Sequence, residues 1–181
     1  PEEATDAGPD SGEHEGDADD GTEPEPDLPE FDDPFMTAVR DRLAAHYDLE
    51  RDYAVEGERF DMYGLLRIES QKQILHPALN WANYESEEHL FVRQQETVGD
   101  RDLDRLVDLA HAIADEWVDA HEEHFGTEFT FVLVVPEVPD AVADRVSGFR
   151  DRTLLKYGYH GQYEVNLAVV APDQETVVAS Q

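Results

Sequence analysis

The sequence predicts an α+β fold: one domain with a mixed sheet of about five to seven strands, packed by two main helices and preceded by a disordered acidic tail. Three observations support this prediction. The first 33 residues have almost no large apolar side chains, and two later segments have apolar residues at helical spacing. Several short segments either alternate between apolar and polar residues or are apolar throughout. Their order (helix, three strands, helix, strand, helix, two or three strands) fits a single domain over residues 34–181.

Residues 1–33 form the predicted tail. They contain 15 acidic residues and no Lys or Arg, and most of the others are small or are Pro. A segment of this composition buries too little apolar surface to offset the loss of chain entropy on folding. We therefore expect disorder up to this boundary.

The first helix is predicted over residues 35–47, where apolar residues recur at helical spacing. Asp32 or Asp33 is available as its N-terminal cap, and Pro34 suits its first turn. A further, short helix is expected over residues 139–148, because it begins with Pro-Asp and ends at a glycine.

The second main helix is predicted over residues 100–125, with Asp100 as its cap and Gly126 as its stop. One face carries an apolar stripe, which consists of Leu103, Leu106, Val107, Ala110, Ile113, Ala114, Trp117, Val118 and His121.

The predicted strands are short and separated by turn residues. Residues 59–68 alternate, so Phe60 and Met62 are expected on the buried face and Asp61 and Tyr63 on the outer face. Residues 129–135 are apolar on both faces, which is typical of a central strand. The other predicted strands are residues 73–75, 88–96, 153–159, 162–170 and 175–179.

The chain is strongly acidic. Asp and Glu number 44 against 13 Lys and Arg, and the formal net charge is −31. Only Lys72 and Lys156 are lysines. Without the tail, 29 acidic residues still face the same 13 basic ones, which leaves the domain at −16. Such a density of carboxylates opposes folding at low ionic strength, whereas at about 1 M salt the screening length falls to roughly 3 Å. We therefore expect a halophilic protein.

Composition also excludes several classes of function. The chain has no Cys, so it has no disulfide, thiolate metal site or cysteine nucleophile. Its apolar runs are too short to cross a bilayer, and its charge disfavours non-specific binding of nucleic acid. No phosphate loop, nucleophile elbow or dinucleotide motif is present, so no cofactor is predicted. No signal peptide is visible, and we expect a cytoplasmic protein. Because the sequence begins with Pro1 and not Met, it is open to being a fragment.

Histidines near the end of the second helix offer a candidate metal site. His121 and His124 are three residues apart, whereas a zinc protease helix needs histidines four apart on one face. His121 falls on the apolar stripe, and His111 and Asp115 fall on the opposite, solvated face. These side chains are not expected to converge, so no metal site is predicted.

The order of elements is also similar to the core of restriction-endonuclease-like proteins, in which a strand aspartate such as Asp61 binds metal. That family also requires an acid-x-Lys motif on the following strand, and residues 90–95 contain neither an acid nor a lysine. Glu69 is the substitute acid. A divergent or inactive nuclease-like enzyme using Asp61 and Glu69 is therefore the alternative hypothesis. The competing interpretation of Asp61 is an outward residue paired with an arginine.

Residues 145–163 are the one basic stretch of the chain, with a net charge of +3. The guanidinium groups of arginine and the hydroxyls of tyrosine together can bind a phosphate, a carboxylate or an acidic partner segment. The competing interpretation is that the cations pair with neighbouring carboxylates and the tyrosines complete the core. The predicted binding residues are Arg150, Arg152, Lys156, Tyr157, Tyr159 and His160.

Several segments together resemble an uncharacterised family of haloarchaeal proteins over about residues 34–181. The segments are residues 35–47, 58–64, 76–79, 88–92 and 148–158. The resemblance implies no activity, cofactor or partner, but it implies that members continue beyond Gln181. The sequence thus predicts a binding or adaptor domain without catalytic residues, whose partner is a protein or a small anionic ligand.

Overall fold

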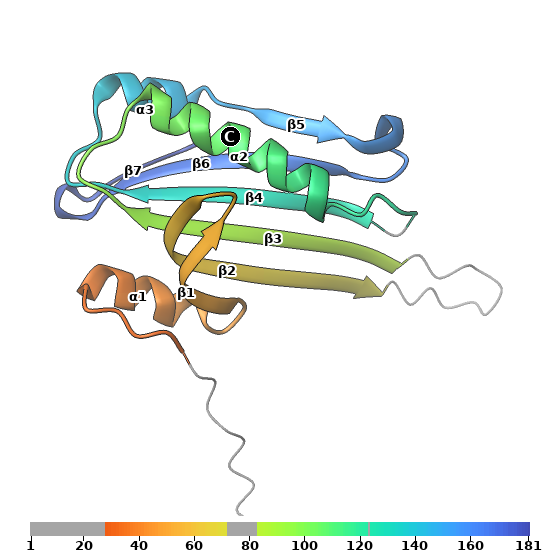
Figure 1. Cartoon of the computed structure of the whole chain (residues 1–181), viewed down its shortest axis with the longest axis horizontal. Helices are drawn as coiled ribbons and strands as arrows, with labels where there is room; N and C mark the ends of the chain where they lie inside the picture. Colours follow the sequence, from red (N-terminus) through yellow and green to blue (C-terminus); the bar gives the residue numbers. More distant parts are fainter. Residues whose placement is uncertain (1–27, 72–82, 123) are drawn as a thin grey trace, which may run out of the picture.

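The computed structural model describes residues 28–71, 83–122 and 124–181, which form a single α+β domain with seven strands and three helices (Figure 1). The predicted fold class is confirmed. The helices are α1 (Pro34–Leu43), α2 (Asp100–Trp117) and α3 (Asp140–Ser147). The strands are β1 (Asp48–Val55), β2 (Glu58–Gln71), β3 (Asn83–Gln94), β4 (His124–Val134), β5 (Asp151–Leu154), β6 (Gln162–Ala171) and β7 (Thr176–Ala179). Two short 3-10 turns, Leu155–Gly158 and Pro172–Gln174, flank β6.

The strands form one mixed sheet in the order β1-β2-β3-β4-β6-β5, and β7 pairs with the other half of β6. Strands β3, β4 and β6 are parallel, and the remaining pairs are antiparallel. The carboxyl ends of the three parallel strands therefore lie at one edge. In open sheets with parallel strands, this edge is where ligands usually bind.

The sheet separates two apolar cores. Helices α2 and α3 cover one face, where Leu106, Ile113 and Val146 pack against the aromatic side chains of the central strands. Helix α1 covers part of the other face, where Met36 packs against Met62. Figure 1 shows α2 lying over the sheet and running obliquely along the direction of the strands. No helix of the described residues is long and apolar enough to cross a membrane.

Helix α1 begins as predicted. The side chain of Asp33 accepts a hydrogen bond of 2.9 Å from the backbone N–H of Met36, and Pro34 is the first helical residue. The composition placed residues 28–33 in the tail, but they contact the domain. Phe31 packs beside the α1 core, and the carbonyl of Pro29 accepts a hydrogen bond from Arg40.

Helix α2 has the predicted apolar stripe but differs at both ends. Its cap is Gly99, whose N–H donates to the Asp102 carboxylate at 2.9 Å, and not Asp100. It ends at Trp117, so the prediction of a helix to residue 125 is wrong. The physical reason is tertiary: residues from His124 onward pair with both β3 and β6, and these ladders outweigh a continued helical pattern.

The alternation predicted for β2 is also wrong in part. Phe60 and Tyr63, three residues apart, both join the core beneath α2, whereas Met62 joins the core beneath α1. Tyr63 is therefore buried and not outward. The strand changes face between these residues, and Asp52 on the paired strand β1 has a φ of 54° at the same place.

The predicted strands differ from the structure at two places, and a third prediction falls outside the described residues. Strand β1 was not predicted, because four of its eight residues are charged and its side chains are largely exposed. The strand expected over residues 153–159 is only four residues long, since a 3-10 turn begins at Leu155. The strand expected over residues 73–75 lies outside the described residues.

Candidate functional site

The structure does not bring the basic residues of segment 145–163 together. Arg145 lies 3.1 Å from Asp100 and also contacts Asp104, both on α2. Arg152 lies 2.7 Å from Glu164 on the neighbouring strand. Two of the four cations are thus neutralised within the domain, which favours the interpretation that they pair with nearby carboxylates.

The other basic residues of this segment lie at its exposed edges. Arg150 donates a hydrogen bond to the side chain of Gln181. Lys156 is exposed on the 3-10 turn and has a φ of 46°. Neither residue lines one of the clefts found in the described part of the chain.

The turn after β5 displays the two predicted tyrosines. Tyr157 is 97% exposed and Tyr159 is 84% exposed. Tyr157 follows Lys156 in the left-handed region, with a φ of 59°. His160 does not face outward with them: its Nδ1 donates a 3.0 Å hydrogen bond to the carbonyl of Ala120, and this contact anchors the turn to the segment after α2.

The two acids of the nuclease hypothesis are not brought together. Asp61 and Glu69 lie eight residues apart in the single strand β2, which corresponds to about 26 Å between their α-carbons. One metal ion cannot bind both. The Asp61 carboxylate instead accepts a hydrogen bond of 2.6 Å from the backbone N–H of Gln94, so its partner is the end of β3 and not an arginine.

His111 is partly solvated, with 40% of its side chain exposed, but both ring nitrogens have partners within the domain. Its Nδ1 is 2.8 Å from the hydroxyl of Tyr163, and its Nε2 is 3.0 Å from the carboxylate of Asp151. The ring therefore ties α2 to β5 and β6. His121 lies beyond the end of α2. Within the described residues, no group of three or more His, Asp or Glu side chains is placed to hold a metal ion.

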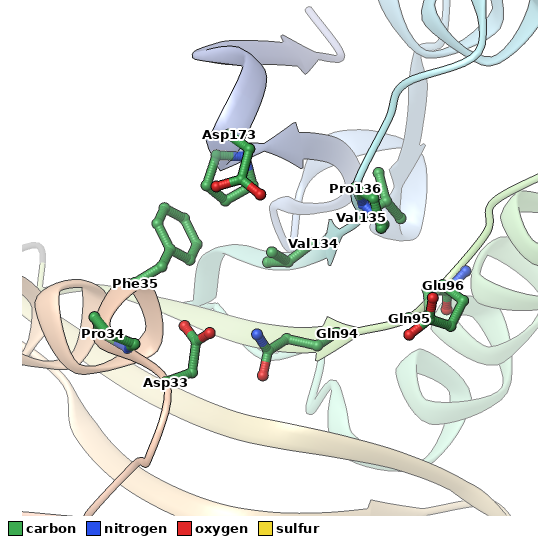
Figure 2. A pocket seen from close by; sticks show the side chains of 11 residues that line it. Asp33, Pro34, Phe35, Gln94, Gln95, Glu96, Val134, Val135, Pro136 and Asp173 are labelled. Atoms are coloured by element: carbon green, nitrogen blue, oxygen red, sulfur yellow. The ribbon is translucent and has the colours of Figure 1, made fainter.

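A cleft with a volume of about 590 Å³ lies at the carboxyl ends of β3 and β4. The first turn of α1 and the 3-10 turn after β6 form its remaining walls (Figure 2). Its lining residues are Asp33, Pro34, Phe35, Gln94, Gln95, Glu96, Val134, Val135, Pro136, Pro172 and Asp173. Sequence reasoning did not identify this site.

The apolar part of the cleft comes from one aromatic, two valines and three prolines: Phe35, Val134, Val135, Pro34, Pro136 and Pro172. Figure 2 shows the Phe35 ring between the start of α1 and Asp173. Pro34 and Pro136 are exposed and Phe35 is half-buried, whereas Val134 and Val135 are buried. The strands β3 and β4 end here, and Pro136 cannot donate to a further ladder hydrogen bond. A ligand in this cleft would bury apolar surface.

Part of the polar lining of the cleft is committed to hydrogen bonds within the domain. Asp33 caps α1, and the Gln95 side chain accepts from Arg93 and donates to the carbonyl of Thr97. The side-chain amide of Gln94 makes no hydrogen bond within the described residues and turns toward Asp33 (Figure 2). Gln94 is therefore available to both donate to and accept from a ligand.

The charge of the cleft selects against anions. The described lining includes three carboxylates, those of Asp33, Glu96 and Asp173, and no Lys or Arg. A phosphate or carboxylate ligand would meet only like charge. The lining also has no Ser, Thr, His or Tyr, so it offers no hydroxyl nucleophile and no imidazole base.

Comparison with known proteins identifies the family but no function. A model described as Domain of unknown function (DUF8052) matches residues 32–181, so the chain belongs to this family. No curated protein and no solved structure matches the chain.

Proposed function

We propose that this member of the DUF8052 family is a non-enzymatic binding module of a halophilic, cytoplasmic protein of haloarchaeal origin. Its ligand is a compact organic molecule, neutral or positively charged, that binds in the cleft at the carboxyl ends of β3 and β4. The observation that carries the proposal is the lining of this cleft, which combines an apolar wall around Phe35 with the uncommitted amide of Gln94 and no basic group.

The position and size of the cleft support a binding role. Ligand pockets in proteins commonly measure about 300–1,000 Å³ and combine an apolar lining with a few polar groups. This cleft has a volume of about 590 Å³ and lies at the sheet edge where parallel strands end. Its described lining residues include three carboxylates but no hydroxyl and no imidazole, so they form no nucleophile–base pair of the hydroxyl–imidazole type.

A matched pair of probes tests the charge preference. We expect 2-phenylethylammonium to shift the amide NMR resonances of Gln94 and Asp173 in molar KCl, and we expect 3-phenylpropanoate to leave them unchanged. Asp173→Asn should weaken the binding of the ammonium about two- to fivefold, because an exposed charge pair contributes little. Asp115→Asn is the control, since Asp115 is an exposed acid on α2. Equal binding of both probes would contradict the proposal.

Halophily has its own test. The domain's net charge of −16 predicts that it loses structure as KCl is lowered from about 1 M to about 0.1 M, because the screening length grows from roughly 3 Å to roughly 10 Å. Circular dichroism at fixed pH measures this loss, and an equal molarity of sucrose controls for excluded-solute effects. A fully cooperative fold at the lower concentration would show that molar salt is not required.

A second candidate site is the turn that carries Tyr157 and Tyr159, with Lys156 as its cation. Two almost fully exposed tyrosines beside a strained backbone are consistent with a partner contact, since aromatic side chains dominate protein interfaces. A photoreactive phenylalanine analogue at position 157 should cross-link a partner protein in cells, and the same analogue at position 115 should not. Inorganic phosphate should shift the Lys156 amide resonance if the ligand is a small anion.

A further inference from the structure

The sheet face opposite α2 is only partly covered. Helix α1 packs over Met62, Val92 and Val134, near the carboxyl ends of β3 and β4. Toward the other end of the same face, no helix of the described chain packs on the strands. Three large apolar side chains of this end are exposed to about half or more of their area: Ile68, Phe125 and Leu154.

Three glutamates stand side by side in the middle of this open face. The strand register pairs Glu88 of β3 with Glu128 of β4, and Glu128 with Glu164 of β6. Directly opposed like charges on neighbouring strands are destabilising. Such a row is not what stability alone would select.

The outer two glutamates are fixed by the domain itself. Glu88 accepts a 2.7 Å hydrogen bond from the hydroxyl of Tyr47. Glu164 pairs with Arg152 of β5 at 2.7 Å. Glu128, between them, has no ion pair within the described residues and contacts only the Asn166 amide, at 3.4 Å. A negative charge at the centre of the row is thus left for a cation from outside.

An apolar hollow borders the glutamate row. The next cross-strand row runs from Ile68 through the small residues Ser86 and Gly126 to Gln162 and then Leu154. The hollow has a volume of about 100 Å³, and Phe125 contributes to its wall. This space suits one aliphatic side chain placed beside a cationic one.

We propose that this open face docks a basic, amphipathic segment of a partner protein, with Lys or Arg side chains over Glu88, Glu128 and Glu164 and apolar side chains in the hollow beside Ile68. Charge complementarity identifies the occupant. Nucleic acids and anionic membranes would be repelled by the glutamates. A second copy of this chain, at a net charge of −31, is a poor source of a basic surface.

Short-range contact makes this docking compatible with high salt. Long-range attraction disappears at about 1 M salt, but partly buried ion pairs are screened much less. The apolar hollow supplies the remaining attraction, and concentrated salt strengthens apolar burial when its ions are excluded from protein surfaces.

Three labelled peptides test the proposal on the full chain in molar KCl. The first combines Lys, Leu and Ala in an amphipathic helical pattern, the second has Glu for Lys, and the third has Ser for Leu. Fluorescence anisotropy should show that the first binds and that the other two bind at least about tenfold more weakly. The double variant Glu128→Gln and Glu164→Gln should weaken the first peptide about tenfold or more. Glu116→Gln, an exposed acid on α2, should not change it.

Other outcomes would overturn the proposal. Equal binding of the Glu peptide would remove the role of charge, and equal binding of the Ser peptide would remove the role of the hollow. Sedimentation showing that the free chain self-associates through this face would make a second copy the occupant. NMR shifts of the unmodified chain on adding the Lys peptide locate the binding site directly. This measurement remains valid even if a variant fails to fold. Shifts confined to the cleft around Gln94 would also contradict the proposal, and they would leave the cleft proposal intact.

Discussion

The hydroxyl of Tyr47 donates a hydrogen bond of 2.7 Å to the carboxylate of Glu88, 41 residues later in the chain. Tyr47 follows α1, and Glu88 lies on β3, so the contact joins the end of the helix to the centre of the sheet. Burial, together with this hydrogen bond to Glu88, raises the pKa of Tyr47 above its usual value. The hydroxyl therefore stays protonated and continues to donate at all physiological pH values.

Removing this donor should destabilise the domain. We expect Tyr47→Phe to lower the free energy of unfolding by about 1–3 kcal/mol, because hydrogen bonds to charged groups contribute roughly this much and Glu88 then keeps only the long, 3.4 Å hydrogen bond from Thr130. Urea unfolding in molar KCl measures the change. Tyr157→Phe removes a hydroxyl from a residue that is 97% exposed and should have no effect. An equal loss in both variants would show that the contact with Glu88 is not the cause.

The ring of Tyr47 requires a glycine beneath it. A Cβ added to Gly64 would lie 3.1 Å from a Tyr47 ring carbon and 3.0 Å from a Leu49 methyl. We expect Gly64→Ala to destabilise the domain by about 1–3 kcal/mol through overpacking. Gly126→Ala, in the neighbouring part of the same sheet, is the control, because its nearest contact would be an ordinary 3.7 Å. Thermal unfolding of the two variants under identical salt compares them, and equal melting temperatures would refute the packing argument.

The sequence allowed the fold class to be predicted because most elements follow simple periodicity. Asp33 capped α1 as expected, and the apolar run in β4 proved to be the central strand. Predictions failed where tertiary pairing outweighs local pattern. The helical stripe continues past Trp117, yet residues from His124 enter two ladders, which satisfy their backbone hydrogen bonds better than a longer exposed helix would.

The candidate sites could not be predicted in the same way, because they depend on register and not on spacing in sequence. Glu88, Glu128 and Glu164 are about 40 residues apart, and each is unremarkable in so acidic a chain. Only the pairing of β3, β4 and β6 places them in one row. The cleft likewise combines four short segments, and its one available signal was the run of polar residues that follows β3.

His89 should make stability depend on pH. Burial lowers its pKa from 6.5 to about 4, which outweighs the opposing effect of Glu87. Its Nδ1 lies 2.8 Å from the Tyr63 hydroxyl, and its Nε2 is buried without a hydrogen-bond partner among the described residues. The unfolded chain therefore binds a proton at a higher pH than the folded domain does. Stability is complete above about pH 6.5 and is lost as the pH falls toward 4.

The expected size of this effect is about 2 kcal/mol between pH 7 and pH 5, where most carboxylates remain ionised. Urea unfolding at several pH values measures it. His89→Phe lacks the titrating ring, so its stability should change less over the same range, although its absolute stability will also differ. His46→Phe is the control, because His46 is exposed after α1. Its free energy of unfolding should change with pH as that of the wild type does. If the free energy of unfolding of the His89 variant changed with pH as much as that of the wild type, His89 would be excluded as the cause of the pH dependence.

Glu128 should lower stability at neutral pH. Burial, and then the charges of Glu88 and Glu164, raise its pKa above 4.5. The folded domain therefore binds a proton more readily than the unfolded chain, and the cost of the charge is fully present above the folded pKa. We expect Glu128→Gln to stabilise the domain by up to about 1 kcal/mol at pH 7, the size of a directly opposed like-charge pair.

Two further measurements distinguish this gain in stability of Glu128→Gln from the effect of lowering the net charge in general. It should shrink as the pH falls toward about 4, because the wild-type carboxyl then becomes neutral as well. It should persist in molar KCl better than any gain from Glu116→Gln, since Glu128 stands between the half-buried Glu88 and Glu164, whereas Glu116 lies on the exposed surface of α2. If the same variant is more stable and yet binds the basic peptide less tightly, then the glutamate row reduces stability and serves binding. A variant that is less stable than the wild type at pH 7 would show that Glu128 already has a favourable partner.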